Sequence, residues 1–445
     1  MKARLRFCLL MMTVLLASCV SISRKPDLDL LYRSSYLNEN AVPIIIIPGL
    51  MGTTLVDQNG VELWPKSVSN LAFSTFEDLA DSENDNLKPG RLLDGFIGVD
   101  FYGALLKTLK TAGRYEAGKL NGPVVNKNKR RYYVFLYDWR KSNFDSVERL
   151  HGLIEQIRAD YKDPSLKVDI IAHSNGGLIA RYYLQYGPQP MHARNSPLPW
   201  AEGDLRIRRI AMLGTPNLGS VISVNRLHQG LRFGLRTIPP HLLVNFATPF
   251  ETLPSPAANV FIDANGTPAP LDIYDPKLWQ QNKWSIYSDD SRQLVREEAA
   301  DPVARQALLE ARFNTNLQQA FAFQSALAKP LARTKAQIAL FGGDCNLSPS
   351  RAVINRKDGQ IALAFEEDKV EKKSRNVNYE LLLSAPGDGL VTRESQLARA
   401  SVDYLDTRLQ QDLFPIAQTT FLCENHQTLT GNPYFQNNLL YFLFH

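Results

Sequence analysis

The sequence has few cysteines, little net charge and no long apolar run after its first residues. Four cysteines among 445 residues exclude a scaffold held together by disulfides. No run beyond residue 18 approaches the ~20 apolar residues that a membrane span requires. A formal net charge of +5 gives no sign of a nucleic acid or other polyanionic partner. Neither metal-ligand spacing nor a phosphate-binding glycine loop occurs, so we expect no metal and no cofactor.

The N-terminus has the features of a secretory signal. MKARLRFCLLMMTVLLASC combines a basic start, a short apolar run and a small-residue end. Its last four residues, Leu16 to Cys19, resemble the lipobox of bacterial lipoproteins, in which the chain is cut before a cysteine that then carries lipid. An ordinary signal peptide with an incidental cysteine is the alternative. We predict a signal peptide over residues 1–18, lipidation of Cys19 and an N-terminal tether over 19–40.

The predicted anchor sets the expected location. Stable attachment through acyl chains needs no spanning helix. Val20 follows the cysteine, and the absence of aspartate there resembles lipoproteins sorted to the outer membrane. We therefore expect a lipid-anchored protein in the envelope of a Gram-negative-type bacterium, at the outer membrane. In that oxidising compartment Cys345 and Cys423 either form a disulfide or remain two buried thiols, and the sequence leaves both open.

Strand and helix patterns alternate along most of the chain. Continuous β-branched runs such as VPIIII at 42–47 indicate strands buried on both faces. Further strands are expected at 131–136, 168–172, 207–214 and 336–344, and helices at 145–161, 178–187 and from Pro302. This order predicts a mostly parallel sheet flanked by helices over 41–445. The pattern breaks down between about 217 and 300, where we expect an inserted cap, and a hairpin is expected to turn at Asp358-Gly359.

Ser174 lies where a buried strand gives way to a helix. Ala172-His173-Ser174-Asn175-Gly176 resembles the G-x-S-x-G nucleophile elbow, with alanine at the first small position. Small residues are needed because the turn is too tight for larger side chains. A polar residue that merely ends a strand is the alternative to a nucleophile. His173 is expected to be a packing residue, because a side chain directly beside the serine points elsewhere.

A serine nucleophile requires a base and an acid later in the chain. His426, in FLCENHQTL, is the histidine left once those on the expected helix, in the cap, before the last strands or at the terminus are set aside. Asp344 ends an expected strand, whereas Asp388 lies in the turn PGDGL. Chemistry alone does not choose between these two carboxylates.

The motifs taken together resemble the lecithin:cholesterol acyltransferase family of α/β-hydrolases. The resemblance runs from about residue 41 to the C-terminus and is carried by PIIIIPGLMGTTL, FLYDWR, AHSNGG, MLGTPNLGS, LDIYDPKLW, PGDGLVTRES and ENHQTL. It implies an α/β-hydrolase fold, places the acid at Asp388, and assigns the oxyanion hole to the N–H groups of Leu50 and Asn175. Many members have methionine where Asn175 stands, so the resemblance leaves substrate choice open.

These roles imply an acyl-enzyme mechanism on lipid esters. His426, oriented by Asp388, would activate Ser174 to attack the ester carbonyl. Water as acceptor gives a lipase or phospholipase, and an alcohol gives an acyltransferase. A non-catalytic lipid-binding lipoprotein is the less favoured alternative, and the oligomeric state is left open. The stretch 223–247 mixes leucines with arginines, which suits either a packed cap or a mobile lid.

Overall fold

The computed structural model describes residues 25–35, 41–65, 86–96, 98–189, 197–233, 236–331, 333–401 and 410–445. The predicted signal peptide and the lipidation of Cys19 lie outside these ranges. Within the predicted tether, Leu28–Leu31 forms the short helix α2, and the Tyr32 hydroxyl donates to the carbonyl of Asn437 (2.7 Å). Among the helices that the structure describes, none has the length and apolar character needed to cross a membrane.

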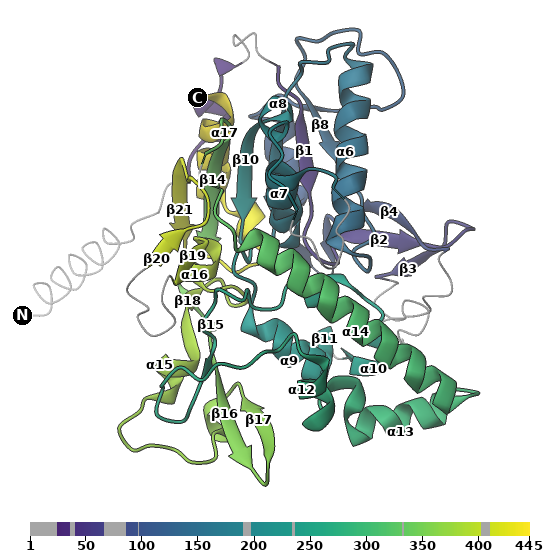
Figure 1. Ribbon diagram of the computed structural model, residues 1–445. Coiled ribbons are helices and arrows are strands. Elements are labelled where there is room, and N and C mark those ends of the chain that lie inside the picture. Colours follow the sequence, from purple (N-terminus) through teal and green to yellow (C-terminus); the bar gives the residue numbers. More distant parts are fainter. Residues whose placement is uncertain are drawn as a thin grey trace, which may run out of the picture.

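The centre of the molecule is a seven-stranded sheet in which every pair of neighbours is parallel (Figure 1). Its order is β21-β14-β10-β9-β1-β8-β7. The strands are Gln418–Leu422 (β21), Gln337–Gly343 (β14), Ile207–Leu213 (β10), Val168–His173 (β9), Ile44–Ile47 (β1), Arg131–Val134 (β8) and Glu116–Ala117 (β7). The predicted parallel sheet is therefore confirmed.

Two apolar cores cover the two faces of this sheet. Ile45 and Ile47 of β1 belong to the core under helices α6 (Asn143–Asp160) and α7 (Asn175–Tyr186). Ile44 and Ile46 face the second core, which α5 (Gly103–Lys110) and α17 (Pro433–Phe444) complete. Since successive side chains of a strand point to opposite faces, a run of four isoleucines supplies both cores at once.

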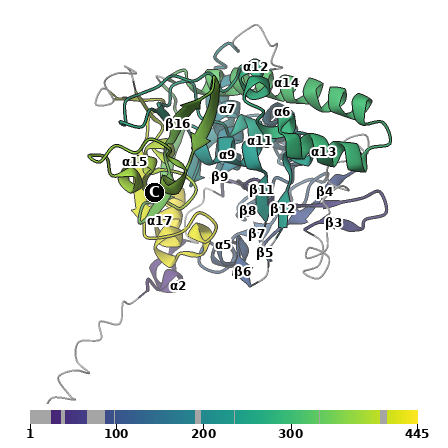
Figure 2. The same ribbon diagram turned by 90° about the horizontal axis from the view of Figure 1, so that it is seen from below.

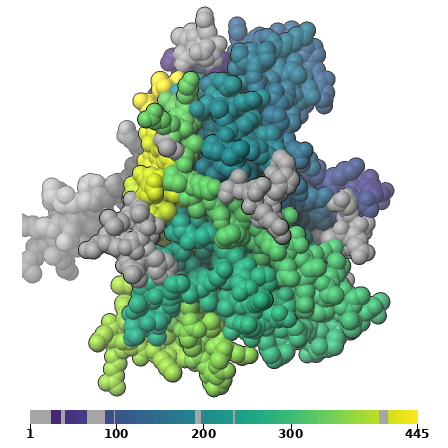
Figure 3. Space-filling model, viewed as in Figure 1, coloured from purple at the N-terminus to yellow at the C-terminus, as the bar shows by residue number. Residues whose placement is uncertain are grey.

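The segment between β10 and β14 forms a cap at the carboxyl end of the sheet (Figures 1 and 2). It contains α9 (Val221–Gln229), β11 (Leu231–Phe233), β12 (Arg236–Ile238), α10 (Pro240–Leu243), α11 (Thr248–Glu251), β13 (Phe261–Ile262), α12 (Pro276–Gln281), η2 (Ser285–Tyr287), α13 (Asp289–Glu298) and α14 (Pro302–Leu327). In the space-filling view its teal and green residues occupy the lower part of the molecule (Figure 3). The stretch 223–247 contributes buried residues to the core that contains Ile45 and Ile47, namely Leu227, Leu231, Leu242 and Leu243. Their burial favours the packed alternative for this stretch.

Smaller sheets surround the large one. The predicted hairpin at Asp358-Gly359 is confirmed, because β16 (Ala352–Lys357) pairs antiparallel with β17 (Gln360–Ala364). β13 of the cap adds to this hairpin as a third strand. Strands β2 (Thr53–Val56), β3 (Glu62–Trp64) and β4 (Lys88–Leu92) form a separate sheet after β1. The remaining pairs among the described residues are β11 with β12, β5 (Gly95–Phe96) with β6 (Val99–Asp100), β15 (Asn346–Pro349) with β18 (Ser384–Gly387), and β19 (Arg399–Ser401) with β20 (Gln410–Asp412).

Candidate active site

Ser174 occupies a strained turn between β9 and α7. Its φ of 54° and ψ of −123° lie in a region that non-glycine residues rarely adopt. A Cβ at Gly176 would lie 2.6 Å from the carbonyl oxygen of Ile47, so only glycine fits there. The turn therefore has the tight geometry that the small residues of the motif predict, and it presents the hydroxyl above the end of β9.

His426 joins the serine to an aspartate. Its Nε2 lies 2.9 Å from Oγ of Ser174, and its Nδ1 lies 2.7 Å from Oδ2 of Asp388. Asp344, the alternative acid, instead forms an ion pair with Arg393 at 3.4 Å. The structure thus brings Ser174, His426 and Asp388 together in the order that a Ser-His-Asp relay requires.

The environment of Asp388 keeps its carboxylate ionised. Burial on its own would raise the pKa of Asp388, but the charge of His426 and the bond from its ring lower that pKa below the usual value. The N–H groups of Leu390 and Val391 donate to Oδ1 of Asp388 at 3.0 and 2.8 Å, and these bonds also lower its pKa. An ionised acid keeps the proton of the imidazole on Nδ1, which leaves Nε2 free to accept the serine proton.

Tyr102 is a site residue for which the sequence gives no motif. The N–H of Gly49 donates to the Tyr102 hydroxyl (2.9 Å), which lies 2.8 Å from Nδ1 of His173. The hydroxyl therefore donates to Nδ1, and His173 donates through Nε2 to the carbonyl of His426 (2.9 Å). Burial, followed by the charge of His426, lowers the pKa of His173 to about 3, so the ring is neutral. His173 lies within the site as a fixed wall, not as the base.

The two predicted oxyanion donors come from two different segments next to the serine. Leu50 follows β1, Asn175 begins α7, and both line the cavity that contains Ser174. Gly49 permits this close approach, since a Cβ there would lie 2.9 Å from the Cβ of Ser174. Within the part of the chain that the structure describes, the N–H groups of Leu50 and Asn175 have no protein acceptor.

A buried polar network ties these two donor segments together. The amides of Asn143 and Asn175 donate to each other at 3.0 and 2.9 Å. Asn175 also donates to the Tyr137 hydroxyl (3.3 Å), which in turn donates to the carbonyl of Pro48 (3.1 Å). Asn175 stands where many members of the family that the sequence resembles have methionine. These hydrogen bonds fix its side chain toward the interior.

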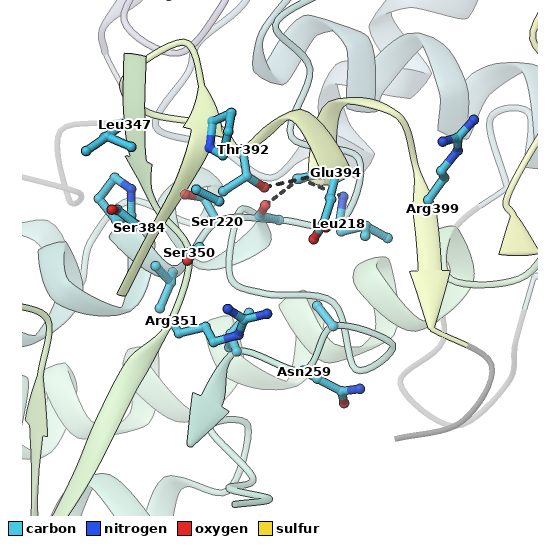
Figure 4. A pocket seen from close by; sticks show the side chains of 18 of the residues that line it. Leu218, Ser220, Asn259, Leu347, Ser350, Arg351, Ser384, Thr392, Glu394 and Arg399 are labelled. Atoms are coloured by element: carbon cyan, nitrogen blue, oxygen red, sulfur yellow. Dashed lines mark hydrogen bonds between the residues drawn. The ribbon is translucent and has the colours of Figure 1, made fainter. Parts of the chain in front are cut away.

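The cavity around Ser174 has a volume of about 200 Å³ and a mainly apolar lining. Its apolar residues include Leu50, Met51, Trp64, Leu93, Phe101, Ile222, Leu231, Leu390 and Val391. Ser220 belongs both to this cavity and to a neighbouring one of about 390 Å³. The neighbouring cavity is lined mainly by residues 218–221 and 257–260, by β15 and β18, and by residues 392–395 (Figure 4). Ser174, Asp388 and His426 are not among its lining residues.

Two further predictions concern cysteines and metals. The structure joins Cys345 and Cys423 by a disulfide bond with a Cα–Cα distance of 4.9 Å. Cys345 follows β14, and Cys423 precedes His426 by three residues, so the bond fixes the start of the loop that carries the histidine. A search of the described ranges finds no cluster of three or more histidine, cysteine or acidic residues able to hold a metal ion.

Comparison with solved structures identifies the fold. A chain of the Tle4-Tli4 complex is 15% identical, with a TM-score of 0.53 over 91% of this chain and 98% of that one. Staphylococcus hyicus lipase is 12% identical (TM-score 0.37; 94% and 95% covered), and EstA from Clostridium botulinum is 13% identical (TM-score 0.36; 94% and 90% covered). The match at a TM-score of 0.53 shows the fold alone, and together with the seven-stranded parallel sheet it confirms the α/β-hydrolase prediction.

Sequence comparison adds a family match over part of the chain. No curated protein matches. The model of the lecithin:cholesterol acyltransferase family matches residues 125–265, which include the FLYDWR stretch, the serine turn and the first part of the cap. Asp388 and His426 lie beyond the matched segment. The predicted resemblance is therefore confirmed over residues 125–265, which are similar to the lecithin:cholesterol acyltransferase family.

Proposed function

We propose that the protein is a serine hydrolase that cleaves lipid acyl esters through an acyl-enzyme. The observation that carries the proposal is the pair of contacts from His426, to Ser174 at 2.9 Å and to Asp388 at 2.7 Å. A hydroxyl within hydrogen-bond reach of an imidazole whose other nitrogen faces a buried carboxylate is the arrangement of an activated nucleophile.

The reaction has two steps. In the first, Nε2 of His426 takes the proton of Ser174 as Oγ attacks the ester carbonyl, and the N–H groups of Leu50 and Asn175 stabilise the oxyanion. The C–O bond to the alcohol then breaks, and His426 returns the proton to the leaving oxygen. In the second, water attacks the acyl-enzyme with His426 as base and releases the acid. An alcohol in place of water would make the protein an acyltransferase.

The mainly apolar lining supports a lipid acyl group as part of the substrate. A long acyl chain gains from leaving water, whereas a small polar ester gains little in such a cavity. We favour hydrolysis as the principal reaction and make transfer an outcome of the test.

The test combines labelling with product analysis. A fluorophosphonate should label the wild-type protein and not Ser174→Ala, and the same variant should lose ester hydrolysis. Products from a lipid ester, measured with and without a long-chain alcohol, separate free acid from a new ester. An unlabelled wild type with a native thermal transition would instead favour a lipid-binding lipoprotein.

We also propose that Cys19 carries lipid and anchors the protein in the envelope, at the outer membrane of a Gram-negative-type bacterium. The lipobox-like residues Leu16 to Cys19 support this location. Cys19→Ser should move the protein from the membrane to the soluble fraction. An unchanged membrane distribution would contradict the anchor without touching the proposed chemistry.

A further inference from the structure

We propose that Arg226 selects ester substrates that carry an anionic oxygen group, a phosphate or a carboxylate, close to the ester. This inference rests on the proposed function and adds a specificity-determining residue to it. Arg226 lies in the last turn of α9 and lines the same cavity as Ser174 and His426. A molecule whose ester carbonyl reaches Ser174 therefore shares its cavity with a guanidinium.

The surroundings of this guanidinium are apolar. A narrow recess of the cavity wall places Arg226 beside Leu50, Leu231, Leu243 and Pro249, and the polar members of this recess are Ser223 and Thr252. Burial lowers the pKa of Arg226, and no neighbouring charge contributes to this shift. An arginine still keeps its charge under these conditions, so the cavity contains a cation that is partly stripped of water.

Other buried or partly buried arginines show what such a group ordinarily contacts. Arg140 pairs with Asp138 at 2.7 Å, and Arg208 pairs with Asp169. Arg181 donates to the carbonyls of Asn217 and Leu327. Within the described ranges of the chain, neither an acid nor a hydrogen-bond acceptor is found for Arg226. An unpaired, partly buried charge is costly, and a bound anion would supply the missing partner.

The geometry of the side chain determines the class of ligand. The planar guanidinium donates two parallel hydrogen bonds to phosphate or carboxylate oxygens. In the weakly hydrated cavity such a pair is stronger than at the surface. Esters with an anionic group near the carbonyl are therefore preferred over neutral esters of the same chain length, and the preference depends on Arg226.

The test uses two matched pairs of esters and the full-length protein. Dihexanoylphosphatidylcholine, kept below its micelle concentration, is compared with dihexanoylglycerol, which lacks the phosphate. The para-nitrophenyl monoester of glutaric acid is compared with para-nitrophenyl pentanoate, which lacks the carboxylate. In Arg226→Gln we expect kcat/KM to fall on the order of 10- to 100-fold for an anionic member. Neutral members should change by less than about twofold. Arg226→Lys should restore part of the loss.

The matched control is Arg296→Gln, which removes an exposed arginine from α13 of the same cap. It should leave all four rates unchanged. A loss confined to the phosphate pair or to the carboxylate pair supports the proposal and identifies the anion. Equal losses on charged and neutral esters, or no loss on either anionic ester, would overturn it. If the wild type hydrolyses none of the four esters, the proposed function itself fails, which is a separate result.

A thermal melt separates selection from a structural role. Removing an unpaired charge that folding partly buries should leave the melting temperature of Arg226→Gln equal to or above that of the wild type. A clear drop in melting temperature together with loss on all esters would show that Arg226 stabilises the cap instead.

Discussion

The two walls of the catalytic cavity differ in how their polar groups are satisfied. On the sheet side, His173, His426, Tyr102 and Asn175 are each fixed by hydrogen bonds between 2.7 and 3.3 Å. The cap side is formed by α9 and the mainly apolar residues around it, and it includes Arg226, for which the described residues of the chain supply no partner. Under the proposed function, the sheet side holds the reacting groups in place and the cap side selects the substrate.

This contrast predicts that changes on the sheet side affect every ester alike, whereas changes on the cap side affect some esters more than others. Four variants test this contrast. Three change the sheet side, and the fourth changes Glu251, which contacts the start of α6 at the junction with the cap.

The largest effect is expected for Asp388→Asn. The amide cannot stabilise the imidazolium, and it favours the wrong tautomer of His426, so kcat should fall on the order of 10³- to 10⁴-fold for neutral and anionic esters. Steady-state kinetics on both pairs of esters measures this. Asp344→Asn is the matched control, because its carboxylate pairs with Arg393. Full activity of Asp388→Asn with loss in Asp344→Asn would reassign the acid.

Removing the disulfide bond should have a smaller effect, which is expected on the stability of the fold. The bond joins residues 78 apart, and opening it frees the unfolded chain, so Cys345→Ala with Cys423→Ala should lower the free energy of unfolding on the order of 2–4 kcal/mol. Urea unfolding under oxidising conditions measures the loss. The double variant should be insensitive to a reductant that destabilises the wild type. Equal stability of the two proteins would show that the bond contributes nothing to the fold.

Glu251, at the junction of the two walls, should make the stability of the fold depend on pH. Its buried carboxylate accepts from the Ser142 hydroxyl (2.5 Å) and the Asn143 N–H (2.7 Å). Burial raises its pKa from 4.5 to about 7, against the effect of these two bonds. The folded protein therefore keeps a proton that the unfolded chain releases near pH 4.5. This proton stabilises the fold at low pH, and the stabilisation is lost as pH rises toward 7.

Glu251→Gln, which stays neutral, removes that dependence. Between pH 4.5 and 7.5 the stability of the wild type should fall relative to the variant by roughly 2–3 kcal/mol. Chemical denaturation at several pH values gives the difference. Glu298→Gln is the control, since that glutamate is largely exposed where it meets His241. If the free energies of unfolding of the wild type and of Glu251→Gln changed with pH in parallel, a raised pKa of Glu251 would be ruled out.

The smallest effect is expected for Tyr102→Phe. The N–H of Gly49 loses its acceptor and His173 loses its donor, while the ring and its packing remain. Leaving such groups unpaired costs about 1–3 kcal/mol, and kcat should fall on the order of tenfold with all esters equally. Melting temperature and kinetics are measured together. A change restricted to anionic esters would break the contrast between the two walls.

The parts of the fold that the sequence predicts are those with a repeating pattern. β1 and β9 are buried on both faces, so their apolar runs are continuous, and α6 keeps Leu150, Ile154 and Ile157 on one side. Much of the cap consists of short elements such as α10 and α11, of four residues each, which are too short to show a period. The long helix α14 follows the pattern expected from Pro302, whereas the short elements could not be predicted.

The site could be predicted where a motif fixes the backbone, and not where distant segments meet. Ser174 follows from its tight turn, whereas the choice between Asp344 and Asp388 depends on which carboxylate reaches His426 in space. Tyr102 and Glu251 carry no motif, because their partners Gly49 and Asn143 are more than 50 residues away in sequence. Only three-dimensional contacts show that Tyr102 belongs to the site and that Glu251 joins the cap to the start of α6.

The edge strand β21 determines when during synthesis the protein acquires its reactivity. The serine turn, the strands around it and the first oxyanion segment are all complete once β10 has been made. The base arrives later, on the loop after Gln418–Leu422, which adds to the sheet beside β14. A growing chain therefore passes through its whole cap before the nucleophile meets its base. Under the proposed function, incomplete chains that end before this strand lack the base and hold an unactivated serine.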